Sequence, residues 1–210
     1  ITSDGKFGFN DTSPERTIDV KGSNCMIQLE GTGGNGRQYS LCSSDDTTGT
    51  AVDGGPSGTF AIYDDTAGAA RLRITSTGLV NAPNQAGFYA RLNSNKNDKT
   101  GDGSYYTVEW DTDSGSICYD QHNTFSTSTG LYQIPTGGDG VYQFATAVCL
   151  STDVYGRQGE GWFLTNTGLR IFFDRRYFPS ATGTITGFYG SCIAKMTAGQ
   201  TIGVQIFVNG

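Results

Sequence analysis

Short runs that alternate between apolar and polar residues recur along the chain, and turn-forming residues separate them. In Arg71-Leu72-Arg73-Ile74 the apolar side chains fall on one face of an extended strand and the charged ones on the other. No window of eleven or more residues has the apolar spacing of a helix without an interrupting Gly or Pro. The pattern therefore predicts strands. In the first half they are expected at residues 6–10, 16–20, 25–30, 38–44, 59–64 and 70–76.

Residues 80–87, VNAPNQAG, separate this half from a second one whose runs are longer and more aromatic. The strands expected there are residues 87–92, 105–111, 116–120, 141–150, 161–166, 169–174, 184–196 and 201–208. Strands that repeat at turn spacings of about 8–12 residues are typical of a β-sandwich or jelly roll. We therefore expect an all-β chain with two domains, residues 1–82 and 83–210.

Composition and charge exclude several classes of partner. Gly accounts for 31 of the 210 residues without a collagen period, and aromatic residues make up 12%, too many for a disordered chain. The net charge is −6 and no basic cluster is present, which argues against nucleic acid and against an anionic membrane surface. The longest uncharged apolar stretch, residues 140–152, is shorter than the about 20 residues of a membrane-spanning helix.

The cysteines bear on the redox state of the chain, and the first residue bears on its processing. The five cysteines are odd in number, widely spaced and without a C-x-x-C pair: Cys25, Cys42, Cys118, Cys149 and Cys192. This favours reduced, buried thiols, and a disulfide pair is the alternative. The chain begins at Ile1 rather than Met, which predicts a piece of a longer polypeptide or a processed product.

One run in the second half carries a more specific pattern. YDQHNTFSTSTGLYQIPTGGDGVYQFATAVCL (119–150) has an Asn before an aromatic residue, then a strand that ends in Pro135, then Gly-Val-Tyr-x-Phe at residues 140–144. It resembles the globular head of the first complement component, in the complement/tumour-necrosis-factor jelly-roll superfamily. The likeness extends over roughly residues 87–210, through GFYARL and TVEWDTD upstream and SCIAKMTAGQTIGVQIF downstream. TGGD at 136–139 makes the approach to Gly140 longer than is usual there.

This resemblance implies a jelly roll that assembles as a homotrimer through aromatic and aliphatic strand faces. The same residues also have a plain physical interpretation. Tyr142 and Phe144 are two positions apart, so they share one face of a strand and are expected to enter the same sheet interface as framework. Pro135 ends the pairing of the preceding strand.

The first half resembles a different class. KFGFNDTSPERTIDVKGS (6–23) is similar to a segment that recurs in bacteriophage tail fibres and related adhesins, on the positions Gly8, Thr12, Ser13, Pro14, Ile18 and Val20. RITSTGLV (73–80) resembles the closing strand of such modules. In that family the segment precedes an intertwined trimeric stem or head, so the resemblance implies a short β-sandwich or β-prism-like stem before the jelly roll.

The segment DKTGDGSYYTVE (98–109) has the spacing of a calcium loop. Asp98, Thr100, Asp102 and Glu109 occupy ligand positions, and Gly103 stands where the loop must turn sharply. Thr at the second ligand position and flanks that read as strands depart from that motif. The sequence therefore leaves two alternatives, a calcium site and an acidic, glycine-rich surface loop.

Catalytic patterns are weak. Glu109, Asp111 and Asp113 alternate along one strand, which is more typical of a solvated edge than of the paired carboxylates of a glycosidase. His122 is the only histidine, and neither a Gly-x-Ser-x-Gly elbow nor a phosphate-binding loop occurs. We expect a protein that is not an enzyme.

Arg and aromatic residues gather in RIFFDRRYFPSATG (170–183). Arg175, Arg176 and Tyr177 are expected in a loop, where a bidentate donor beside a flat ring suits a sugar. Packing against a neighbouring subunit is the alternative.

Together these features predict a virion appendage, a tail or capsid fibre with no nucleic-acid or membrane partner. Its homotrimeric head would bind a host surface glycan or protein, and its N-terminal side would meet other virion proteins. The alternative is a capsid or baseplate decoration module without a receptor.

Overall fold

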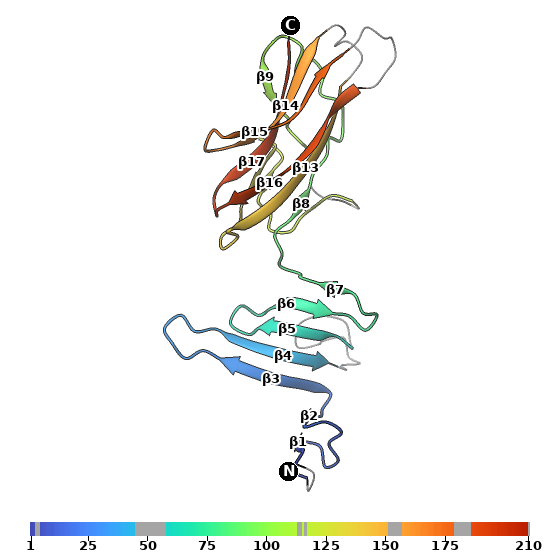
Figure 1. Cartoon of the computed structure of the whole chain (residues 1–210), viewed down its shortest axis with the longest axis vertical. Helices are drawn as coiled ribbons and strands as arrows, with labels where there is room; N and C mark the ends of the chain where they lie inside the picture. Colours follow the sequence, from blue (N-terminus) through green and yellow to red (C-terminus); the bar gives the residue numbers. More distant parts are fainter. Residues whose placement is uncertain are drawn as a thin grey trace. The chain divides into compact units, whose positions relative to one another are not determined.

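The computed structural model describes residues 1–2, 5–44, 58–112, 115, 117–150, 157–178 and 186–209, with the side chain of Thr186 left out. In these residues every regular element is a strand, which confirms the all-β prediction (Figure 1). Contacts divide the chain into two compact units, Ile1–Gln85 (unit 1) and Ala86–Gly210 (unit 2). The division follows residue 85, and the sequence placed it near residue 82.

Unit 1 contains one five-stranded antiparallel sheet in which each strand lies beside its predecessor, β3-β4-β5-β6-β7, and a separate parallel pair, β1-β2 (Figure 1). The strands are β1 (Phe7–Phe9), β2 (Ile18–Val20), β3 (Asn24–Glu30), β4 (Gln38–Ser44), β5 (Phe60–Asp64), β6 (Ala69–Ile74) and β7 (Val80–Asn81). A β-bulge between Ile62 and Tyr63 shifts the register of β5 against β6.

The two faces of this sheet differ in their side chains. One face carries the small buried residues Ser40, Cys42 and Ala61, and the larger Met26, Tyr63 and Arg73 lie directly opposite them on neighbouring strands. The other, here called the apolar face, carries large side chains that are exposed or partly exposed. Cross-strand pairing and alternation place on it Ile27, Leu29, Tyr39, Leu41, Phe60, Ile62, Leu72, Ile74 and Val80.

A buried carboxylate, that of Asp64, is paired with two arginines at one end of the sheet. Asp64 has no exposed side-chain surface and accepts hydrogen bonds from Arg37 Nη2 (2.6 Å) and from Arg71 Nη2 (2.6 Å) and Nε (3.0 Å). The amide of Ala67 donates to its other oxygen at 3.0 Å. Burial by itself raises the pKa of Asp64, but the hydrogen bonds from Arg71 and Arg37 outweigh burial and lower the pKa to about 2.

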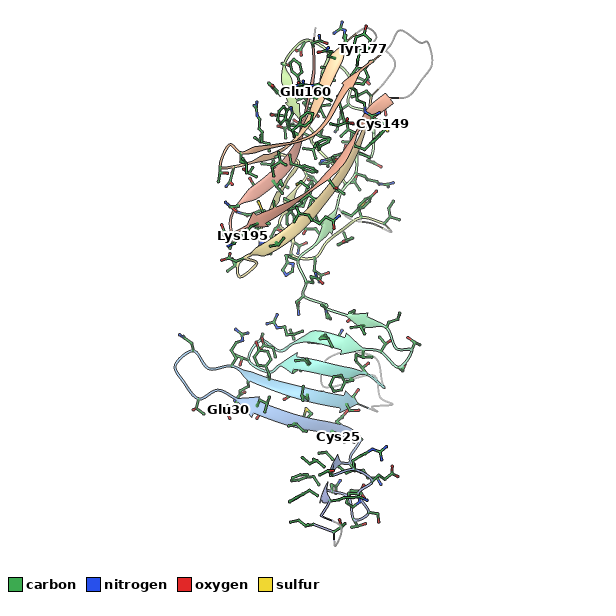
Figure 2. The ribbon with its side chains drawn as sticks, in the orientation of Figure 1. Cys25, Glu30, Cys149, Glu160, Tyr177 and Lys195 are labelled. Carbon is green, nitrogen blue, oxygen red and sulfur yellow. The ribbon has the colours of Figure 1, made fainter. Side chains whose placement is uncertain are left out.

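Unit 2 has a six-stranded sheet of order β11-β12-β17-β14-β15, in which β9 also pairs with β17, together with two two-stranded pairs, β13-β16 and β8-β10. The strands are β8 (Phe88–Tyr89), β9 (Tyr105–Thr107), β10 (Tyr119–Asp120), β11 (Phe125–Ser126), β12 (Leu131–Gln133), β13 (Gly140–Leu150), β14 (Gln158–Thr165), β15 (Arg170–Tyr177), β16 (Thr186–Met196) and β17 (Thr201–Val208). The long β13-β16 ribbon is prominent in Figure 1, and Cys149 and Lys195 lie toward its opposite ends in Figure 2.

The hydrophobic core of unit 2 lies between the ribbon and the six-stranded sheet. Phe144 and Val148 project inward from β13, Phe163 from β14, and Val204 and Ile206 from the central strand β17. The Tyr142 and Phe144 rings stack with centroids 6.0 Å apart, which agrees with the shared strand face expected from their spacing. This arrangement is that of a β-sandwich.

Several sequence-based bounds and one burial prediction need correction. The strand expected at 105–111 ends at Thr107, and those expected at 87–92 and 116–120 shrink to two residues each, β8 and β10. All five cysteines are thiols, and Cys42 and Cys118 are buried as expected. Cys149, however, is exposed, because it alternates with the inward-facing Val148 and Leu150 in β13.

Candidate recognition surface

The segment around Arg175, Arg176 and Tyr177 is a strand, so the prediction of a loop is wrong. β15 continues to Tyr177 because its pairing with β14 continues, through Asp174 opposite Gly161 and Arg175 opposite Glu160 to Tyr177 opposite Gln158. The amide of Phe178 then donates to the carbonyl of Arg157 at 2.9 Å.

Strand geometry separates the three predicted residues. Arg175 and Tyr177 pair with Glu160 and Gln158, whose side chains point away from the core, and both are exposed. Arg176 pairs with the buried Gly159 and therefore lies on the inner side of the sheet. The structure thus brings Arg175 and Tyr177 to one face and places Arg176 on the other.

The outward face that receives Arg175 is rich in aromatic rings. We call it the aromatic face of unit 2, and its members on β9, β14, β15 and β17 are Tyr105, Glu160, Trp162, Arg170, Phe172, Arg175, Tyr177, Gln205 and Phe207. Trp162 and Phe172 meet edge to face with centroids 5.0 Å apart. Tyr105 contacts Phe207 at 5.0 Å, and the guanidinium of Arg170 lies 4.4 Å from the Tyr105 centroid.

Charged groups on this face are paired with one another. Arg175 Nη2 donates to Glu160 Oε1 at 2.5 Å, and its guanidinium lies 5.8 Å from the centroid of the Phe172 ring. The Arg175 side chain is 64% exposed, so water screens this ion pair and its contribution to stability is small. Glu160 and Tyr177 lie toward the same end of unit 2 (Figure 2).

Two polar atoms on this face have no hydrogen-bond partner among the described residues. Trp162 and Gln205 are directly opposite each other on β14 and β17. The indole Nε1–H of Trp162 and the amide Oε1 of Gln205 are both buried and unbonded. One is a donor and the other an acceptor, so a single hydroxyl group that reached both would satisfy them together.

The side chain of Arg176 contacts residues of β15 and β16. Its Nε donates to Asp174 Oδ2 at 2.8 Å, its Nη1 to the hydroxyl of Tyr189 at 3.0 Å, and its guanidinium lies 4.1 Å from the Tyr189 centroid. The hydrogen bond to Asp174 raises the pKa of Arg176. Arg176 therefore ties β15 to β16.

The sequence interpretation missed the rings of Tyr105, Trp162, Phe172 and Phe207. A signal was available in GEGWFLT, where Gly159, Gly161 and Phe163 alternate with Glu160 and Trp162. The glycines lie inside, and a Cβ on Gly161 would overlap the ring of Phe173. The alternation thus turns Glu160 and Trp162 outward.

Of the predicted calcium ligands, Asp102 is held by hydrogen bonds to a neighbouring residue of the loop. Asp98 has a positive φ of 54°, and Asp102 Oδ1 accepts hydrogen bonds from the amide (2.9 Å) and hydroxyl (2.6 Å) of Ser104, which lower the pKa of Asp102. Thr100 Oγ1 is buried and unbonded. Within the described ranges, no three Asp, Glu, His or Cys side chains form a group that could hold a metal ion. Asp98 and Glu109 lie within these ranges, whereas Asp113 lies outside them.

A separate cavity of about 480 Å³ lies in unit 2 between residues 88–91 and residues 143–147 of β13. Its inner wall is formed by Trp110, Phe125 and Phe163. None of the described residues that line it is an acid, a histidine, a cysteine or a lysine. It offers shape and apolar surface.

Comparison of the chain with protein-family models, curated proteins and solved structures finds no match. Among the elements that the structure describes, no helix has the length and hydropathy needed to cross a membrane.

Proposed function

We propose that this chain is a non-enzymatic recognition protein of a virion appendage, a tail or capsid fibre, whose unit 2 binds a host surface glycan or protein. The observation that carries the proposal is the aromatic face. It places three exposed rings, Tyr105, Phe172 and Tyr177, beside the Arg175–Glu160 pair on a hydrogen-bonded sheet. The homotrimer and the N-terminal contact with other virion proteins, both implied by the resemblances, belong to the same proposal.

The chemistry of this face suits a glycan. Aromatic rings offer flat surfaces to the C–H groups of a sugar, and Arg with Glu offers donors and acceptors to its hydroxyls. Because the sheet fixes these groups, little conformational freedom is lost on binding.

The cavity supports a binding role over a catalytic one. General acid–base catalysis requires a titratable side chain within hydrogen-bond reach of the reacting atoms. Of the described residues that line the cavity, none is an acid, a histidine, a cysteine or a lysine.

A second candidate is a capsid or baseplate decoration module without a receptor. The internal pairing of Arg175 with Glu160 and of Arg176 with Asp174 favours it, since both guanidinium groups already have partners. In that case the aromatic face would be an assembly contact.

The test is binding of the full chain to host cells and to a glycan array. We expect Tyr177→Ala and Phe172→Ala each to weaken binding by about tenfold or more, the range of interface aromatic residues. Tyr119→Ala is the matched control, because Tyr119 is a similarly exposed tyrosine (54%, against 63% for Tyr177) on β10, outside the aromatic face. Wild-type protein that binds neither cells nor glycans would favour the decoration module.

A further inference from the structure

The large apolar side chains of unit 1 lie on the exposed side of its sheet. Neighbouring strands place them in rows, with Ile27, Leu41, Ile62 and Leu72 directly opposite one another across β3, β4, β5 and β6. Ile27 is 47% exposed, and Leu29 and Val80 at the ends are more exposed still. The apolar face is therefore continuous across all five strands, and no described residue of unit 1 covers it.

Unit 1 also lacks a hydrophobic core of its own in the described residues. The core cluster of the molecule begins at Val108 and lies wholly in unit 2. Among the described residues of unit 1, the buried hydrophobic ones are Cys42, Ala61 and Ala70, which are small. A sheet of this size must bury one face of large apolar side chains, because that burial offsets the conformational entropy lost when its strands become ordered. The cover of the apolar face is thus part of the fold of unit 1.

Residues 45–57 of unit 1, which the structure does not describe, are mainly polar in sequence. Residues 45–57, DDTTGTAVDGGPS, contain only Ala51 and Val52 as aliphatic residues besides Pro56. A cover that folding requires must be present whenever the chain folds, and another copy of the same chain always meets this condition.

We propose that the apolar face of unit 1 packs against the same face of other copies of this chain, so that unit 1 gains its core by assembly. This inference deepens the homotrimer of the proposed function by naming its contact surface, and it does not depend on receptor binding by unit 2.

Area and charge are consistent with self-association. For ordinary side-chain areas, the exposed parts of the nine residues come to roughly 600 Å² per copy, against about 800 Å² per partner in a standard interface. The nine residues themselves are uncharged. At one end of the face Asp64, directly opposite Tyr39, is paired with both Arg37 and Arg71 of the same copy, so its carboxylate stays paired when identical faces meet and one positive charge per copy remains at that end.

Adjacent residues of β3 provide a matched pair of variants. Ile27 lies on the apolar face, and Met26, with nearly equal exposure (45%), lies on the opposite face. In the full chain, Ile27→Lys should weaken association at least about tenfold because it would bury a charge, whereas Met26→Lys should leave it unchanged. Light scattering of the wild type should give a multiple of the 22.3 kDa chain mass.

A second measurement applies if Ile27→Lys does not fold. Hydrogen exchange of the wild type should show that protection of β3–β6 falls on dilution, while protection of β14 and β17 does not. A wild-type monomer at micromolar concentration, or equal effects of the two lysines, would overturn the inference. A dimer that meets these tests would support packing through the apolar face and contradict the homotrimer. A trimer would support both. Neither result bears on glycan binding by unit 2, which is tested separately.

Discussion

Arg176 and Tyr177 are neighbours in β15, yet their side chains lie on opposite faces of the six-stranded sheet. Arg176 is opposite the buried Gly159 and binds Asp174 and Tyr189. Tyr177 is opposite Gln158 and 63% exposed. The two residues therefore have separable roles, one in holding β15 to β16 and one in contacting a partner.

This separation predicts different consequences of their replacement by Ala. Arg176→Ala should lower the free energy of unfolding of unit 2 by about 1–2 kcal/mol, because Asp174 loses a charge-assisted hydrogen bond and Tyr189 its cation contact. Tyr177→Ala should change it by less than about 0.5 kcal/mol. Both tryptophans, Trp110 and Trp162, lie in unit 2, so their fluorescence during denaturation measures its unfolding. Equal losses in the two variants would contradict the assignment.

The sequence could not show that Arg175–Tyr177 form a strand. The run DRRYF carries three charges in succession, which locally resembles the end of a strand. What extends β15 is its pairing with Gln158–Glu160 of β14, a long-range contact that single-sequence patterns do not contain. For residues 201–208, a largely apolar run that Gln205 interrupts, the predicted and observed bounds agree.

Alternation predicted which residues share a face of the unit 1 sheet, but it could not predict which face is covered. Arg71-Leu72-Arg73-Ile74 predicted one apolar face and one charged face, without saying which would be covered. The structure instead buries Ser40, Cys42 and Ala61 and exposes Leu41. Sequence periodicity does not reveal which face is covered, because that depends on what packs against the sheet.

Calcium binding at Asp98, Thr100, Asp102 and Glu109 remains a prediction of the sequence. Calcium should raise the melting temperature of unit 2 and a chelator should lower it, because a ligand bound only to the native state adds RT ln(1 + [L]/Kd). Binding requires Asp102 to give up its bonds to Ser104, so Asp102→Asn should abolish the shift. Identical melting curves with calcium and with chelator would assign the segment to a self-bonded surface turn.

Acid should weaken unit 1 through Asp64. Its pKa is about 2 in the folded chain and lies near 3.9 in an unfolded one, so its contribution is complete above pH 4 and is lost as the pH falls toward 2. Asp64→Asn should remove this part of the pH dependence and lower stability at neutral pH by about 1–3 kcal/mol, since Arg37 and Arg71 lose their acceptor but stay hydrated. Hydrogen exchange at β5 and β6 as a function of pH measures both effects. Unaltered pH dependence in the variant would show that other carboxylates dominate.

Phe173 is held between two strands that each present a glycine to its ring. A Cβ at Gly161 of β14 or at Gly190 of β16 would overlap the Phe173 side chain, so these strands approach it only because both residues are glycine. Gly190→Ala should lower the free energy of unfolding of unit 2 by about 1–3 kcal/mol, the usual effect of overpacking. Gly140→Ala, also in unit 2, would meet only ordinary contacts (Tyr142 Cε2 at 3.7 Å) and has no positive φ, so it should be neutral within about 0.5 kcal/mol.

A double-mutant cycle identifies the atoms responsible for the loss in Gly190→Ala. Phe173→Leu removes part of the ring that the new methyl group would meet, so the double variant should lose less stability than the sum of the two single variants. The expected coupling is about 0.5–2 kcal/mol, measured by denaturation followed through Trp110 and Trp162. Additive losses would show that the methyl group displaces the β16 backbone rather than Phe173, and that the spacing of the two layers does not depend on this ring.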